Sequence, residues 1–225
     1  MAEATDEDLL RRWSTGDAAS GEALFERYAE AIYRYFRNKL DADAQELTQR
    51  TFLRCMEVAD RYRGEGGFRA FLYGIAHNVL REHFRAQAQG RVVDFAAVSV
   101  ADLGMSIGSQ VAASQQQLLL LFALRTLPLQ SQELLELFYW EEIGVSELAR
   151  ILDMPAGTIK RRLWRARRLL EEALGRLEMS DALRRTTTST LASWAAAHRE
   201  RRAEDTGEYA DDDTESTEST ESTES

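Results

Sequence analysis

The residues best suited to chemistry in this sequence form a dense run of cations around one tryptophan. The stretch MPAGTIKRRLWRARRLL, residues 154–170, holds basic but no acidic side chains, although the chain has a formal net charge of -10. Guanidinium groups neutralise phosphates and make paired hydrogen bonds to guanine. No nucleophile–base pair or phosphate-binding loop accompanies them. The pattern therefore indicates nucleic-acid binding, and we expect no enzymatic activity.

The acidity of the chain is confined to its C-terminal end. Residues 203–225 contain ten acidic and no basic side chains, which leaves residues 1–202 without net charge. A second basic segment lies at residues 61–91, where arginines are interleaved with aromatic side chains. Two basic patches on a neutral body are typical of proteins that contact nucleic acids.

The same composition argues against several other classes of protein. The single cysteine, Cys55, excludes an intramolecular disulfide, and its apolar neighbours favour a buried thiol over a reactive one. No Cys/His cluster has the spacing of metal ligands, so we expect neither a metal nor a cofactor. The N-terminus MAEATDEDLL does not resemble a signal peptide, and no apolar run approaches the ~20 residues of a membrane span. We therefore expect a cytoplasmic protein without membrane insertion.

Helices must position the basic segments, because the chain has only two prolines and many Ala, Leu, Arg and Glu residues. Thr5 with Asp8 predicts a capping box that opens a short helix. A longer helix is predicted up to about Leu40, and Asp43 with Glu46 predicts the next helix start. A glycine-rich break precedes a further helix that ends near residue 85. Residues 1–87 are thus predicted to form one helical domain in an all-α chain.

A second helical domain is predicted at residues 116–178, after a flexible linker at residues 88–115. Its last two helices, from residue 145 to 152 and from about residue 157, flank a turn with the spacing of a helix-turn-helix motif. The remaining residues, 179–225, form a C-terminal extension.

The final helix separates into two faces on a helical wheel. Ile159, Leu163, Ala166 and Leu170 fall on one side and are predicted to pack against the domain. The opposite face suits the major groove of DNA, with Thr158 placed to hold a phosphate. That face comprises Arg161, Trp164, Arg165 and Arg168, with Lys160, Arg162 and Arg167 along its edges. An ordinary solvated basic face is the alternative, but an exposed tryptophan fits it poorly.

Three segments also resemble extracytoplasmic-function (ECF) sigma factors of the sigma-70 family. The stretch LRTLPLQSQELLELFYWEEIGVSELARILDMPAGTIKRRLWRARRLL resembles their promoter-recognising region 4. The stretch DADAQELTQRTFLRCMEV resembles region 2.2, and FRAFLYGIAHNVLREHFRAQ resembles regions 2.3 and 2.4. The resemblance spans about residues 6–87 and 116–175.

This resemblance implies a transcription initiation factor whose partners are promoter DNA and core RNA polymerase, through the β′ clamp helices and the β flap. It also suggests an anti-sigma factor. The residues at positions that bind polymerase in the family are Asp43, Glu46, Gln49 and Phe52. The minus-ten element would be contacted by Tyr62, Arg63, Tyr73, His77, Asn78, Arg81 and Arg85. The residues that would contact the minus-thirty-five element are Thr158, Lys160, Arg161, Trp164, Arg165 and Arg168.

The sequence departs from the family pattern at four positions. Arg50 stands where Glu is common, Phe71 where Trp is usual, Glu82 where Asp is usual and Gly144 where Ser is common. Arg50 inverts a charge on the presumed polymerase surface. The periodicity places Phe71 and Phe68 in the core rather than against DNA bases.

Two questions remain open at the level of sequence. The acidic tail, with its Thr-Glu-Ser repeat, is either a solubilising segment or an autoinhibitory one that competes with DNA phosphates. The main rival function is a conventional helix-turn-helix regulator with an N-terminal sensing or dimerisation domain. A helical scaffold without DNA contact is the other rival, and the Arg/Trp face argues against it.

Overall fold

The architecture is all-helical, as predicted. The structure, a computed structural model, describes residues 4–40, 42–64, 66–88, 92–102 and 115–176. Within these ranges there is no strand, only an isolated bridge between Ser99 and Pro128. The whole C-terminal extension, residues 179–225 with its acidic tail, lies outside the described residues, as do residues 89–91 and 103–114 of the predicted linker.

Four helices and a short 3-10 turn form the N-terminal half. They are α1 (Asp6–Ser14), α2 (Ala18–Arg37), α3 (Ala44–Glu57), η1 (Ala59–Arg61) and α4 (Gly67–Gln87). The predicted cap of α1 is present, since the Asp8 backbone N–H donates to the Thr5 hydroxyl at 3.2 Å. The helices close over a core that includes Leu24, Phe36 and Leu72, each fully buried.

Four more helices form the C-terminal half, namely α5 (Gln115–Arg125), α6 (Leu129–Tyr139), α7 (Val145–Ile151) and α8 (Ala156–Arg176). The inward face of α8 is the predicted one, because Ile159, Leu163, Ala166 and Leu170 are all buried. Ala166 and Leu170 pack with residues of α5 and α6. A 3.6-residue period was sufficient to identify this face.

Two details of the N-terminal half differ from the sequence-based prediction. Asp43 does precede α3, but its side chain makes no capping hydrogen bond and lies 3.3 Å from His83 Nε2 on α4. The 3.6-residue period also predicts that Leu47, Phe52 and Met56 share one apolar face of α3, but Met56 is 44% exposed. Both differences arise because the packing of α3 on α4 decides which side of α3 is covered.

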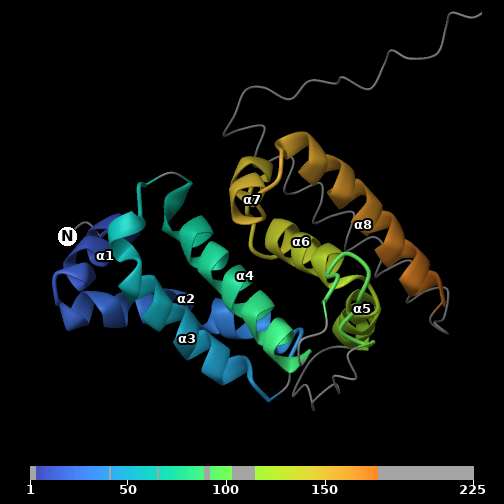
Figure 1. Cartoon of the computed structure of the whole chain (residues 1–225), viewed down its shortest axis with the longest axis horizontal. Coiled ribbons are helices and arrows are strands. Elements are labelled where there is room, and N and C mark those ends of the chain that lie inside the picture. The colour runs from blue at the N-terminus through green and yellow to red at the C-terminus, as the bar shows by residue number, and fades with distance from the viewer. Residues whose placement is uncertain (1–3, 41, 65, 89–91, 103–114, 177–225) are drawn as a thin grey trace, which may run out of the picture.

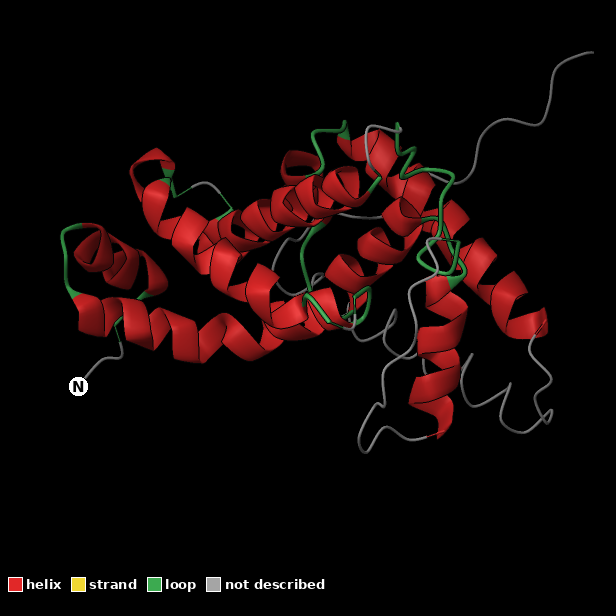
Figure 2. Ribbon diagram, turned by 60° about the horizontal axis from the view of Figure 1, so that its bottom comes forward, coloured by secondary structure: helices red, strands yellow, loops and turns green. Residues whose placement is uncertain are grey.

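The two halves pack directly against each other (Figures 1 and 2). Apolar side chains of α6 and α7, among them Leu137 and Leu148, belong to the same core cluster as residues of α4. Segment 92–102, part of the predicted linker, is packed into this contact: Phe95 is buried against Phe84, and the Gln130 N–H donates to the Phe95 carbonyl at 3.0 Å. No helix in the described part is both long and apolar enough to cross a membrane.

Candidate nucleic-acid interface

The α7–turn–α8 unit has the geometry of a helix-turn-helix. α7 begins after Gly144, whose backbone N–H donates to the Glu147 carboxylate at 2.7 Å, so Gly144 starts the helix without the usual serine hydroxyl. The chain reverses at Asp153, whose φ of 51° lies in the left-handed region that aspartate tolerates. α8 then runs for 21 residues.

The outer face of α8 is basic and exposed. Lys160, Arg161, Arg165 and Arg168 are all exposed, and Trp164 among them is 60% exposed. The Arg168 guanidinium lies 5.2 Å from the centroid of the Trp164 ring, which holds the indole against a cation. Thr158, close to the start of α8, is half-buried. The side chains predicted to face DNA therefore do share the solvent side of one helix.

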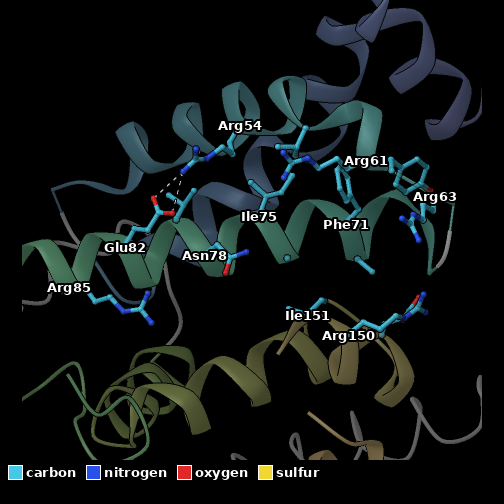
Figure 3. Close-up of a pocket in the computed structure, with 16 residues that line it drawn as sticks. Arg54, Arg61, Arg63, Phe71, Ile75, Asn78, Glu82, Arg85, Arg150 and Ile151 are labelled. Carbon is cyan, nitrogen blue, oxygen red and sulfur yellow. Dashed lines mark hydrogen bonds and ion pairs between the residues drawn. The ribbon is translucent and has the colours of Figure 1, made fainter. Parts of the chain in front are cut away.

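A second basic surface is a cleft of about 600 Å³ between α3 and α4 on one side and α7 on the other (Figure 3). The Arg150 guanidinium of α7 closes against the backbone at Gly66, where a Cβ atom would lie 2.5 Å from Nη2. Ile151 lies beside Arg150, across the cleft from Phe71 and Asn78. The walls are formed by Arg54, Val58, Arg61, Tyr62, Arg63, Ala70, Phe71, Gly74, Ile75, Asn78, Val79, Glu82, Arg85, Glu147, Arg150 and Ile151.

The residues predicted to contact a minus-ten strand fall into two groups, one that lines the cleft and one that does not. Tyr62, Arg63, Asn78 and Arg85 line the cleft. The others do not, and their positions are described below. Phe71, predicted as core, is only half-buried; it lines the cleft and stacks near Tyr62, with ring centroids 5.1 Å apart. The cleft thus combines aromatic rings with cations, a combination that suits single-stranded nucleic acid.

Tyr73, His77 and Arg81 lie away from the cleft. Tyr73 and His77 are buried on the side of α4 that faces the C-terminal half, and His77 Nδ1 lies 2.6 Å from a Glu133 oxygen of α6. The Arg81 guanidinium is 4.8 Å from the centroid of the Phe95 ring. Tyr73 packs against Tyr35 of α2 and His77 against Glu133 of α6, so neither is accessible to DNA in this conformation, whereas Arg81 is half-buried beside Phe95.

The predicted polymerase surface on α3 requires one correction. Glu46 and Gln49 are exposed, and Asp43 is half-buried, but Phe52 is only 5% exposed and packs against Phe25 with ring centroids 4.9 Å apart. Phe52 is therefore a core residue.

Sequence reasoning also missed two exposed apolar side chains on the same helix. Leu53 is 59% exposed and Met56 44% exposed, and both share a stripe with Glu46 and Gln49 at helical spacing. Apolar side chains that stay exposed on an otherwise well-packed helix indicate a contact surface.

The departures from the family pattern at Arg50 and Glu82 are linked. Arg50 Nη2 lies 2.8 Å from a Glu82 oxygen, and Arg54 Nη2 lies 3.2 Å from the other oxygen of the same carboxylate. The charge reversal at Arg50 is thus matched across the α3–α4 contact by Glu82. Both side chains are about half exposed, so this pairing contributes little stability.

We predict that His83 makes stability fall on mild acidification. Burial between α3 and α4 lowers the pKa of His83 below its ordinary 6.5, although Asp43 and Glu46 act in the opposite direction and Arg50 in the same one. The unfolded chain therefore binds a proton below about pH 6.5 that the folded chain does not bind, so stability is lost as pH falls below that value. The urea midpoint should fall more between pH 7.5 and 5.5 for the native chain than for His83→Gln. Equal falls would contradict this assignment.

Comparison with known families covers both halves of the molecule. Sigma-70 region 2 matches residues 24–90, and sigma-70 region 4 matches residues 117–170, which together exceed half of the chain. The chain belongs to the ECF group of the sigma-70 family. It is 30% identical over 171 residues to the ECF RNA polymerase sigma factor BldN of Streptomyces coelicolor, a match that covers 74% of this chain and 65% of that relative. It is 26% identical over 183 residues to the ECF RNA polymerase sigma-E factor of Haemophilus influenzae, covering 76% and 95% of the two chains.

Solved structures support the fold of this ECF chain. A structure of CnrH in complex with the cytosolic domain of CnrY aligns with a TM-score of 0.56 at 20% identity, covering 76% of this chain and 97% of CnrH. The sigma factor RpoE of Bartonella quintana, in complex with the anti-sigma factor NepR, aligns with a TM-score of 0.55 at 20% identity, covering 69% and 96%.

Proposed function

We propose that this chain is a sigma factor that binds core RNA polymerase and directs promoter-specific initiation. The observation that carries the proposal is the presence of regions 2 and 4 in order, each with an exposed basic and aromatic surface. In this proposal α8 enters the major groove of the minus-thirty-five element. Lys160, Arg161, Arg165 and Arg168 contact bases and phosphates there, Trp164 packs beside them and Thr158 holds a phosphate.

The cleft beside α4 would receive the minus-ten strand. Tyr62 and Phe71 offer ring faces for unstacked bases, Arg63 and Arg85 offer cations for the backbone, and Asn78 offers an amide for a base edge. His77 would join this surface only after α6 moves away, and Arg81 only after segment 92–102 does, whereas Tyr73 packs against Tyr35 of α2 within the N-terminal half. Unstacking costs a few kcal/mol, which these contacts would offset.

Polymerase would be bound by both halves of the chain. The α3 stripe of Glu46, Gln49, Leu53 and Met56, with Asp43 at its start, suits the β′ clamp helices, and the C-terminal half suits the β flap. An anti-sigma factor is a further proposed partner. Of the two aligned structures, one holds RpoE with the anti-sigma factor NepR, and the other holds CnrH with the cytosolic domain of CnrY.

Reconstitution with core polymerase tests the proposed function. The chain should convert core enzyme into one that initiates at discrete sites on genomic DNA fragments of its own organism, and a pre-melted template should reduce its dependence on the α4 cleft. Tight duplex binding without any stimulation of initiation would instead favour the conventional helix-turn-helix regulator.

We predict that Leu53→Glu weakens binding to core polymerase by about tenfold or more, because a carboxylate would replace an apolar contact in the middle of the α3 stripe. Val92→Glu is the matched control, since Val92 is 98% exposed and lies far from α3 in sequence. Both variants should keep the native melting temperature, because neither side chain is buried. Binding can be measured by fluorescence anisotropy of the labelled chain. Equal affinities for the two variants would remove α3 from the polymerase surface.

A further inference from the structure

The contact between the two halves is built around buried ionisable groups. Lys39 of α2 is fully buried, and its Nζ lies 2.5 Å from a Glu136 oxygen of α6 and 2.8 Å from the Tyr35 carbonyl oxygen. Gln132 Nε2 donates to the other Glu136 oxygen at 2.9 Å. This lysine and this carboxylate are separated by nearly one hundred residues of sequence, so they meet only because the halves close.

A second carboxylate of α6 contacts α4. Glu133 is 2% exposed, lies 2.6 Å from His77 Nδ1 and accepts a hydrogen bond from the Tyr35 hydroxyl. Burial opposes the charge on Glu133, but His77, Tyr35 and Lys39 together hold its pKa below the ordinary value. Burial raises the pKa of Glu136 despite Lys39.

The edge of the contact carries a third carboxylate. Glu141, just beyond α6, lies 3.0 Å from Arg69 Nη2 of α4 and 3.6 Å from Arg34 Nη2 of α2. Three acidic side chains from one short segment therefore meet cationic or hydrogen-donating groups of the N-terminal half.

Such a contact is suited to opening as well as to closing. Buried ion pairs add little net stability over an apolar core of the same shape, because removing the charges from water costs about as much as their attraction returns. They do impose one geometry, and on separation each group regains water. This regained hydration offsets part of the cost of separating the halves.

We infer that α6 is an internal latch: Glu133, Glu136 and Glu141 hold the free chain closed, and this latch must open before the side of α4 that carries His77 can contact DNA. The effect of the latch on DNA contact rests on the proposed function, whereas the closed contact of α6 with α2 and α4 does not. In the closed form His77 is covered by Glu133 of α6, and α7 forms one wall of the cleft that contains Asn78. Polymerase or DNA would bind the open form preferentially and so displace the equilibrium.

Fluorescence energy transfer within the full chain tests the latch. Dyes are placed at Arg12→Cys in α1 and Glu171→Cys in α8, both exposed positions on opposite halves. The native Cys55 is fully buried and its thiol pKa is raised to about 12, so labelling is selective for the introduced cysteines. Glu133→Gln with Glu136→Gln should lower the closed fraction at least tenfold. Asp6→Asn is the control, since it removes a 2.7 Å ion pair with Arg27 inside the N-terminal half.

Charge reversal of the Arg69–Glu141 pair gives a second test by energy transfer. This test replaces the first if circular dichroism shows that the glutamine variant has lost native helical content. Arg69→Glu and Glu141→Arg should each lower energy transfer, and the two together should restore much of it. Unchanged transfer in the folded glutamine variant, or no restoration by the double reversal, would overturn the latch.

Chemical modification separates the latch from the proposed function. Diethylpyrocarbonate should modify His77 at least tenfold faster in the glutamine variant than in the native chain, as read by mass spectrometry, while His83 serves as the internal reference. Rapid modification of His77 in the native chain would overturn the latch. If the variant opens but neither form supports initiation by core polymerase, the proposed function fails and the latch stands.

Discussion

Replacing both Arg161 and Arg165 with alanine is expected to weaken binding to duplex DNA by about 2–4 kcal/mol, or roughly 30- to 900-fold, because each is expected to contact a base edge or a phosphate. Both side chains are exposed on the outer face of α8, so their loss should not disturb the core formed by Ile159 and Leu163. The salt dependence of the affinity should also fall, by about one in slope for each lost phosphate contact.

Arg11→Ala with Arg12→Ala is the matched control, because it removes the same charge from an exposed helix of the other half. Affinity for a promoter-containing duplex should be measured over a range of salt concentrations for the native chain and both double variants. Equal affinities and equal slopes for the two double variants would show that α8 contributes only general charge. That result would support the alternative of a solvated basic face.

Lys39→Met is expected to cost about 3–5 kcal/mol in the free energy of unfolding at pH 7.5, because it leaves Glu136 buried without its cation. The cost should shrink towards pH 5, since burial already raises the pKa of Glu136 and loss of Lys39 would raise it further. Protonation then removes the unpaired charge. Urea titrations followed by circular dichroism at both pH values measure the effect.

Adding Glu136→Leu to Lys39→Met should recover most of that loss, because both charges are then replaced by apolar side chains of similar size. A double variant as unstable as the sum of the two single variants would show that the pair is not coupled. If the halves separate before either unfolds, the denaturant dependence of the transition should also decrease, since less surface is exposed in each step.

Many of the local features could be predicted from sequence because they depend on neighbours within a helical turn or two. The Thr5 cap, the turn at Asp153 and the buried stripe from Ile159 to Leu170 are all of this kind. The exposed basic face of α8 follows from the same periodicity, since a helix that buries one face must show the other. The order of the motifs was enough to indicate the family.

Exposure of individual side chains on α3 and α4 could not be predicted in that way. Periodicity shows that Phe52 and Met56 lie near the same side of α3, but the positions of α2 and α4 bury one and leave the other exposed. Tyr73 and His77 carry the chemistry expected of DNA contacts, and only the packing of Tyr35 on Tyr73 and of α6 on His77 shows that they are buried.

The sequence by itself determined the helices, their apolar faces, the segregation of charge and the membership of the sigma-70 family. Tertiary structure decided that Lys39 pairs with Glu136 and His77 with Glu133, and that the two halves close on each other. The physical reason is the distance along the chain over which each interaction acts. Helix periodicity and capping are set within a few residues, whereas a buried ion pair depends on how distant segments are brought together, which no local pattern specifies.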